Sequence, residues 1–306
     1  MTTTASATSS KTKASSKKPS MAKSKSATKR SSTRIASASK EAPAQVNWYV
    51  LLEQAVKEPG ELHSALVHFR KYSLANRWLA STQLRAAGVR LQPINTFAGW
   101  MAVNRPVMAG QKAAVSLNMP VTIRKKDSAG TEPDSDIEGK TFTAFLLKRH
   151  WFYMDQTAGE DYKPEEIPVE DWNPARGMDF LGMTEVPFVY SGVSDHRLSY
   201  SNGRTLAISG IVEHPTFQRL REMARIQLGH NDATPGPNVP NEVNLLEIEV
   251  EATAYLCAAT VGIPGLEQAQ HTLQQRLAEI DMPRIPAKCA KRAFAAADHL
   301  VNAGYC

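Results

Sequence analysis

A stretch in the second half of the chain carries charged side chains at the spacing of a zinc-binding motif. Arg221, Glu222 and Arg225 stand where His-Glu-x-x-His would have its first histidine, its glutamate and its second histidine. In that motif two neutral imidazoles one helical turn apart bind zinc, and the glutamate acts as general base. A guanidinium stays protonated and offers only hydrogen-bond donors, so it cannot ligate zinc. The stretch therefore predicts a helix without a metal, in which Glu222 is vestigial.

Two interpretations of these arginines remain open. In the first, Arg221 and Arg225 replace the positive charge of a metal and pair with Glu249 or Glu251 of a downstream acidic helix. In the second, both arginines lie on the wet face of an amphipathic helix, as charged residues usually do. Four apolar residues at helical spacing predict one buried stripe on this helix: Phe217, Leu220, Ala224 and Leu228.

An active metal site built from other ligands is a third alternative. His214, His230 and Glu251 are the residues available for it, but they are scattered along the chain. A catalytic zinc needs three protein ligands that converge on one tetrahedral ion. We therefore expect no cofactor, no metal and no peptidase activity, and we keep the zinc peptidase as the competing hypothesis.

The first half of the chain interleaves aromatic and basic residues between positions 48 and 112. Single-stranded DNA is bound by this mixture, because bases stack on aromatic rings while cations follow the backbone. The alternative is that most of these aromatics fill the core of a small domain. The candidate DNA-binding residues are Arg70, Lys71, Tyr72, Asn76, Arg77, Trp78, Trp100, Arg105 and Lys112.

Charge is distributed unevenly along the 306 residues. Residues 1–40 hold ten Lys or Arg and no acid, whereas residues 151–306 hold 12 basic and 21 acidic side chains. A polyanion such as nucleic acid is attracted to the basic residues 1–40 and repelled by the acidic residues 151–306. The Ser, Thr, Ala and Lys composition of residues 1–44 predicts a disordered tail.

Hydrophobic periodicity predicts an α+β fold. Apolar residues at helical spacing indicate three helices before Gly88, with Glu-Pro-Gly at 58–60 as a break, and Thr96 can cap a further short helix. Alternation with period two predicts a β-hairpin formed by residues 114–124 and 140–154. The three helical ranges are 46–57, 61–72 and 73–87.

The second half of the chain is predicted to be mainly α-helical. Short strands are expected at 188–192 and 204–209, before the helix that carries Arg221 and at least two C-terminal helices. A proline-rich, acidic stretch marks a boundary between domains. The predicted organisation is a tail at 1–44, a DNA-binding domain at 45–160, a linker at 161–175 and a second domain at 176–306.

Several linear motifs of the first half resemble the N-terminal domain of ArdC-type antirestriction proteins. One run, FRKYSLANRWL, contains Tyr72, Ser73 and Asn76, and a later run leads from the aromatics near position 100 to an apolar strand. The chain departs from the family pattern at Asn104, where a glycine is usual, and in its less basic turn at Met108 and Ala109. The other matching positions are Phe97, Trp100, Arg105, Val107, Gly110, Lys112, Pro120, Asp155, Gln156 and Thr157.

The second half resembles the metallopeptidase-like domain of the same family in its layout. The resemblance places Arg221 and Arg225 at the zinc-ligand positions, with Glu251 on the downstream acidic helix. It implies a cytoplasmic, single-stranded-DNA-binding antirestriction protein of a mobile genetic element, acting during conjugation, whose zincin-like domain is degenerate. A regulatory scaffold that binds a protein partner at the acidic half is a further alternative.

The cysteine content and the hydropathy agree with a cytoplasmic protein. The three cysteines, Cys257, Cys289 and Cys306, form no Cys-x-x-Cys pair and no disulfide framework. No apolar run reaches the roughly 20 residues needed to span a bilayer, so no membrane association is expected.

Overall fold

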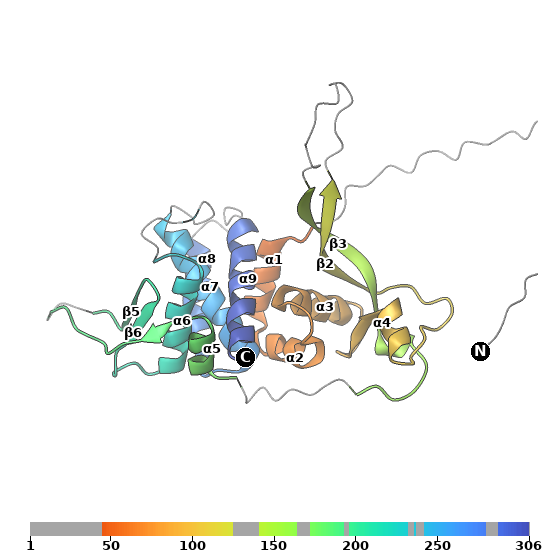
Figure 1. Ribbon diagram of the computed structural model, residues 1–306, viewed down its shortest axis with the longest axis horizontal. Helices are drawn as coiled ribbons and strands as arrows, with labels where there is room; N and C mark the ends of the chain where they lie inside the picture. The colour runs from red at the N-terminus through yellow and green to blue at the C-terminus, as the bar shows by residue number, and fades with distance from the viewer. Residues whose placement is uncertain are drawn as a thin grey trace, which may run out of the picture. The chain divides into compact units, whose positions relative to one another are not determined.

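The computed structural model describes residues 45–124, 141–163, 172–192, 196–231, 236, 242–279 and 287–305. Helices and two separate three-stranded sheets make up this part of the chain (Figure 1), which confirms the α+β class. Ala42–Cys306 form one compact unit. The predicted basic tail at 1–44 lies outside the described residues. No helix within the described ranges combines the length and the apolar character that crossing a membrane requires.

Three helices open the described chain: α1 (Trp48–Lys57), α2 (Pro59–Phe69) and α3 (Leu74–Ala86). The predicted break after α1 is also the start of α2, because Pro59 occupies the first turn, where its missing N–H is not needed. Gly88 follows α3 with a φ of 68°, a conformation that glycine adopts without strain.

The predicted hairpin is present as β2 (Val115–Arg124) and β3 (Thr141–Tyr153). These strands pair antiparallel, and β1 (Ile94–Thr96) adds to the other side of β3. The sequence analysis did not predict β1, which is three residues long. The predicted cap of the next helix, α4 (Phe97–Ala102), is confirmed, because Thr96 Oγ1 accepts a hydrogen bond of 3.1 Å from Gly99 N.

Helix α3 covers the free edge of β2 with two amide side chains. The backbone N and O of Asn118 bond to the Asn76 side chain at 2.8 and 3.1 Å. The backbone N and O of Ser116 bond to the Gln83 side chain in the same way, both at 2.8 Å. An unpaired strand edge exposes N–H and C=O groups, and these amides satisfy them.

The second sheet and the remaining helices form the other half. Strand β6 (Thr205–Ile208) lies between β5 (Ser199–Asn202) and β4 (Thr184–Glu185), antiparallel to β5 and parallel to β4. The prediction of a strand at 188–192 is wrong, since β4 ends before it, and β5 was not predicted. The helices are α5 (Pro174–Phe180), α6 (Pro215–Gln227), α7 (Val243–Val261), α8 (Leu266–Glu279) and α9 (Ala287–Ala303).

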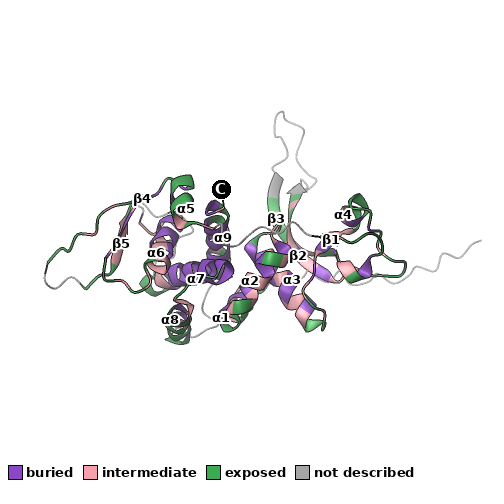
Figure 2. Ribbon diagram, turned by 90° about the horizontal axis from the view of Figure 1, so that it is seen from below, coloured by how far each residue is buried: buried purple, intermediate pink, exposed green. Residues whose placement is uncertain are grey.

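Helix α7 is the centre of the core. Its residues from Ile248 to Val261 are all buried (Figure 2), and α2, α6, α8 and α9 pack against it. The main hydrophobic cluster therefore includes side chains from α1 to α3 as well as from α6 to α9. A smaller cluster lies between α2, α3 and the first sheet. The division into domains at 45–160 and 176–306 stays a prediction.

Candidate functional site

Four of the candidate DNA-binding side chains are buried. Trp78 and Trp100 are 0% exposed, and their indole N–H groups donate to Leu51 O at 3.0 Å and to Phe152 O at 2.8 Å. Arg77 and Arg105 are also buried. A ring without exposed surface cannot stack on a base, so the structure assigns both tryptophans to packing instead. This agrees with the core alternative left open by the sequence.

The two buried arginines bond to the protein itself. Arg105 Nε donates to Thr157 Oγ1 at 3.0 Å, and Nη1 donates to the carbonyls of Gly159 and Glu160. Arg77 donates to Arg70 O at 2.8 Å. These bonds fix the surrounding backbone, so neither guanidinium is placed to contact phosphate in this structure.

Of the remaining candidates, Lys71 and Lys112 are exposed, whereas Asn76, Tyr72 and Arg70 have intramolecular roles. Asn76 covers the β2 edge, and Tyr72 donates its hydroxyl to Ile94 O at 3.0 Å. The Arg70 guanidinium lies 4.2 Å from the centre of the Tyr305 ring. Burial also raises the pKa of Tyr72 to about 12, which keeps the phenol neutral.

The motif segments around Arg105 and Thr157 lie against each other. Met108 N donates to Gln156 O at 2.9 Å, and Gln156 Nε2 donates to Lys112 O at 2.8 Å. The motif positions in these two segments therefore include residues whose hydrogen bonds join the loop after α4 to the segment after β3. Lys112 itself projects from this frame and is exposed.

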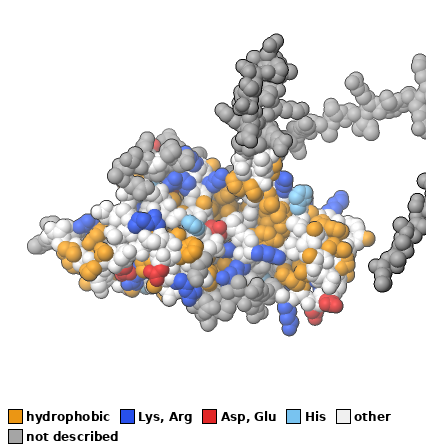
Figure 3. All heavy atoms as spheres, viewed as in Figure 1, with side chains coloured by type: hydrophobic (Ala, Val, Ile, Leu, Met, Phe, Trp, Pro, Cys, Tyr) orange, Lys and Arg blue, Asp and Glu red, His pale blue; other side chains and the backbone are white. Residues whose placement is uncertain are grey.

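A different set of side chains is exposed around α4. Phe97 is 54% exposed, Met101 49% and Met108 40%, and they lie on α4 and the following loop together with exposed Lys112. We call Phe97, Met101, Met108 and Lys112 the α4 surface. Hydrophobic side chains are also visible on the face in Figure 3 near α4 and the hairpin, with Lys and Arg beside them. The sequence places Phe97 among the interleaved aromatics and at a motif position, but Phe97 was not among the predicted DNA-binding residues, because exposure is not readable from composition.

In the second half of the chain, α6 and α7 face each other across an ion-pair network. Arg221 Nε donates to Glu251 Oε1 at 2.7 Å, as one of the predicted pairings requires. Arg225 Nη1 and Nη2 donate to the two oxygens of Glu247 at 2.7 and 3.2 Å. Arg221 Nη2 also reaches Glu247, at 3.3 Å. Each arginine is about three-quarters buried, so these are not freely solvated side chains.

The pairing of Arg225 with Glu247 shifts the pKa values of the two groups in opposite directions. Burial opposes the charge on Arg225, but its hydrogen bonds to Glu247 and the attraction of that carboxylate raise the pKa of Arg225. Burial likewise opposes the charge on Glu247, and the hydrogen bonds and charge of Arg225 outweigh it and lower the pKa of Glu247. Both groups are therefore charged at neutral pH.

The expectation that Glu249 pairs with these arginines is wrong. Its carboxylate accepts from His230 Nε2 at 3.0 Å and from Arg292 Nε at 3.1 Å. Glu249 lies two residues from Glu247 and from Glu251, so it points to another side of α7. Glu247 was missed, although its i,i+4 spacing from Glu251 matches the i,i+4 spacing of the two arginines and could have identified it.

Glu222, at the position of the general base, is buried and fully engaged. Its two oxygens accept hydrogen bonds from Ser199 Oγ at 2.5 Å and Ser201 Oγ at 2.6 Å, both on β5. Arg225 Nε lies 3.6 Å from the same carboxylate. These contacts attach α6 to the second sheet. A carboxylate held by two hydroxyl donors is a structural anchor here.

The residues of the alternative metal site have separate partners. His230 bonds to Glu249 and Glu251 to Arg221, while the His214 ring lies 4.0 Å from Glu213. Within the described ranges, no group of three or more His, Cys, Asp or Glu side chains is placed to hold a metal ion. Cys289 lies near Glu249, and burial together with that carboxylate raises the pKa of its thiol to about 12.

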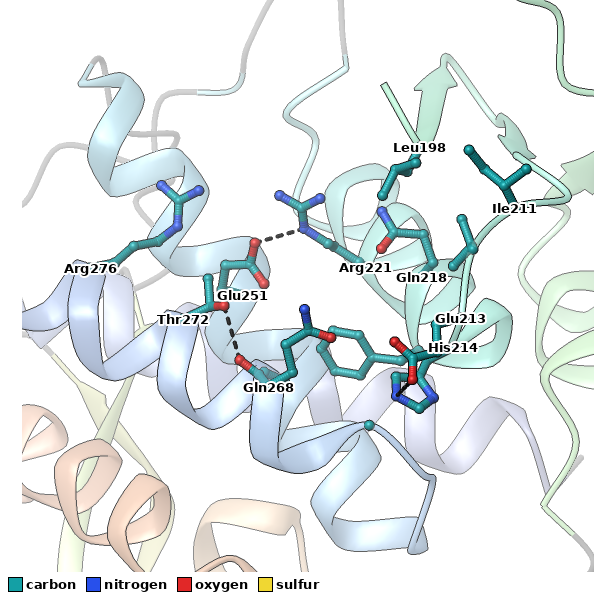
Figure 4. Close-up of a pocket in the computed structure, with 14 residues that line it drawn as sticks. Leu198, Ile211, Glu213, His214, Gln218, Arg221, Glu251, Gln268, Thr272 and Arg276 are labelled. Atoms are coloured by element: carbon teal, nitrogen blue, oxygen red, sulfur yellow. Dashed lines mark hydrogen bonds and ion pairs between the residues drawn. The ribbon is translucent and has the colours of Figure 1, made fainter. Parts of the chain in front are cut away.

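A pocket of about 380 Å³ opens beside this network. Its walls come from α6, α8 and residues 211–214, and Figure 4 shows Arg221 and Arg276 on either side of Glu251 in that view. The opposite end is formed by Leu198 and Ile211. Sequence reasoning did not identify Arg276, which lies on a helix with no motif.

Comparisons with known proteins give a resemblance of fold. No protein-family profile matches the chain, and no curated protein matches its sequence. The metal-free structure of the antirestriction protein ArdC from plasmid R388 is 15% identical, covers 84% of this chain and 97% of that chain, and has a TM-score of 0.48. For the Mn(II)-bound structure the values are 16%, 85%, 98% and 0.43. The chain is thus similar to solved ArdC structures over most of both chains, at low sequence identity.

Proposed function

We propose that this protein binds single-stranded DNA through the α4 surface and acts as an antirestriction-type protein of a mobile element. The observation that carries the DNA-binding part is the exposure of Phe97, Met101 and Met108 on α4 and the loop that follows it, together with the exposed cation Lys112 of the same loop. Exposed rings and cations together are what an unpaired strand requires. The antirestriction role rests on the motif resemblance of the first half of the chain.

Phe97 is the strongest stacking candidate of this surface. Its ring makes a T-shaped contact with Phe152, with ring centres 6.4 Å apart, and 54% of the residue's surface stays exposed. The Thr96 cap and the pairing of β1 with β3 hold the start of α4, which limits the entropy that Phe97 would lose on binding. A base stacked on a ring contributes about 1–3 kcal/mol and does so for every base.

The cations of this region favour contact with a backbone rather than with base edges. Lys112 and Lys71 are exposed, and the sequence adds ten further Lys or Arg in residues 1–40. Lysine is a flexible point charge that tracks phosphates without fixing a sequence. We therefore propose binding with little base preference and with strong dependence on salt.

A binding titration of the full chain tests this proposal. We expect a single-stranded oligonucleotide to bind at least about tenfold more tightly than a duplex of the same length, because a duplex hides its base faces. Fluorescence anisotropy at matched ionic strength measures both affinities. Equal affinity for the two forms would contradict a stacking surface.

We further propose that the second half is a peptidase-like fold that has lost its metal. The support is the pairing of Arg221 with Glu251 and of Arg225 with Glu247, because guanidinium groups with carboxylate partners fill the positions that two zinc-binding imidazoles would need. Glu222 is bonded to two serines and serves to join α6 to β5.

Metal analysis of the purified chain tests this second part. We expect less than about 0.1 zinc per chain after dialysis against zinc-containing buffer, because guanidinium groups present no lone pairs. Inductively coupled plasma mass spectrometry measures the ratio of zinc to protein. One zinc per chain, whose removal by a chelator lowers the melting temperature, would favour an active zinc site instead.

A further inference from the structure

The pocket beside the ion-pair network contains an arginine that has no partner among the residues that the structure describes. Arg276 projects from α8 into the pocket, and none of the described residues provides a hydrogen bond or an ion pair to its guanidinium. Its Nε is buried and has no acceptor. A guanidinium carries five N–H donors, and leaving buried donors unpaired destabilises the protein. Arg276 therefore differs from Arg221, which bonds to two carboxylates in the same region.

The existing carboxylates do not satisfy Arg276. Glu251 is bonded to Arg221, and Glu247 is bonded to Arg225. Arg276 makes no hydrogen bond to Glu247 and only helps to lower its pKa through the attraction between their charges. A guanidinium that donates two parallel hydrogen bonds needs a planar acceptor such as a carboxylate. The pocket volume of about 380 Å³ leaves room for such a group from another molecule.

Two exposed aliphatic side chains line one end of the pocket. Leu198 is 46% exposed and Ile211 is 75% exposed, and both line the pocket at the end away from Arg276 (Figure 4). Two exposed aliphatic side chains at one cavity mark a surface that gains by being covered. Gln268 lies between the two ends and offers an amide group of the kind that bonds to a peptide backbone, while the amide nitrogen of neighbouring Gln218 donates to Ser199 Oγ.

We propose that this pocket binds a peptide segment in which a carboxylate lies next to an aliphatic side chain. Arg276 receives the carboxylate, and Leu198 and Ile211 cover the aliphatic group. The carboxylate is supplied either by an acidic side chain or by a peptide chain end, which present the same planar group.

A peptide fits this pocket better than nucleic acid does. Glu213 and Glu251 also line it, and residues 151–306 carry nine more acidic than basic side chains, 21 against 12. A phosphate backbone would be repelled by this surface, whereas one carboxylate beside an aliphatic group matches Arg276, which has no carboxylate partner among the described residues. The inference is independent of DNA binding by the α4 surface.

The test uses three acetylated tripeptides and the full chain. Leu-Glu-Leu amide offers a side-chain carboxylate, Leu-Gln-Leu acid offers a chain-end carboxylate, and Leu-Gln-Leu amide offers neither. Isothermal titration at millimolar concentrations, with inorganic phosphate as a fourth probe, measures binding. We expect at least one acidic peptide to bind and the neutral peptide to bind at least about tenfold more weakly, as for a charge-assisted hydrogen bond. Whichever acidic peptide binds identifies the source of the carboxylate.

Variants connect the binding to the pocket. Arg276→Gln should weaken binding of the acidic peptide at least about tenfold. Lys288→Gln removes an exposed cation of α9 and should leave the affinity for that peptide unchanged. Ile211→Ser changes a side chain that is 75% exposed, so the fold should persist while peptide binding weakens. Melting curves show whether each variant is folded.

The proposal fails if neither acidic peptide binds, if the neutral peptide binds equally well, or if Arg276→Gln is folded and binds with unchanged affinity. If Arg276→Gln does not fold, unchanged peptide affinity of Ile211→Ser overturns the proposal. Loss of single-stranded DNA binding by folded Arg276→Gln, with peptide binding intact, would assign the pocket to nucleic acid.

Discussion

Arg225→Ala is expected to destabilise the protein by about 3 kcal/mol. The substitution removes both hydrogen bonds that Arg225 makes to Glu247, and it removes the cation nearest to the buried carboxylate of Glu222. The Glu222 side chain is 3% exposed, so its charge cannot be compensated by water. Removing one partner of a buried charge pair costs more than the pair itself contributes.

Arg219→Ala provides a matched control on the same helix. Arg219 donates two hydrogen bonds to Glu185, at 2.6 and 2.9 Å, but no second carboxylate depends on it. We expect a loss of about 1 kcal/mol or less, because the carboxylate left without its partner, Glu185, is exposed to water, whereas Glu222 is buried. Urea unfolding of both variants gives the free energies. A change within about 0.5 kcal/mol for Arg225→Ala, the range for surface substitutions, would rule out charge replacement.

Phe97→Ala is expected to weaken single-stranded DNA binding by about tenfold or more, because a stacked base contributes about 1–3 kcal/mol. The side chain is 54% exposed, so its removal should leave the fold intact. Duplex binding should change little, since its bases already stack on one another. The ratio of the two affinities therefore falls in this variant.

Phe180→Ala is the matched control for this effect. Phe180 is 59% exposed and lies at the end of α5, outside the α4 surface. Its removal changes total exposed aromatic area in the same way, but we expect no change in DNA affinity. Anisotropy titrations of both variants at one salt concentration make the comparison. Equal losses, or no loss in either, would mean that Phe97 does not stack on DNA.

Local patterns predicted much of the fold. The period-two alternation of residues 114–124 predicted β2, and helical spacing predicted α1, α2 and α3 to within a few residues. Strands β1 and β5 were missed, because the three residues of β1 are too few to show a period and the Ser-Tyr-Ser-Asn sequence of β5 has no apolar alternation, unlike the equally short β6. These strands depend on pairing with β3 and β6, which the local sequence does not encode.

The candidate site was predicted less completely. The positions of Arg221 and Arg225 follow from motif spacing, but Glu247 required knowledge of which side of α7 faces α6. Tryptophan and arginine composition did not distinguish buried from exposed side chains, so Trp78 and Trp100 were assigned to DNA although they fill the core. Burial is set by contacts between distant segments. Arg276 could be identified only from the structure, which shows its buried Nε without an acceptor among the described residues.

The most direct test of single-stranded DNA binding by the α4 surface is a titration of a chain that lacks residues 1–40. Removing ten cations should flatten the dependence of affinity on salt, because fewer counterions are released. The preference for a single strand over a duplex should remain, since the proposed stacking residues lie within the remaining chain. A folded, truncated chain that binds both forms equally, while the full chain prefers the single strand, would place the selectivity in the tail and contradict the account.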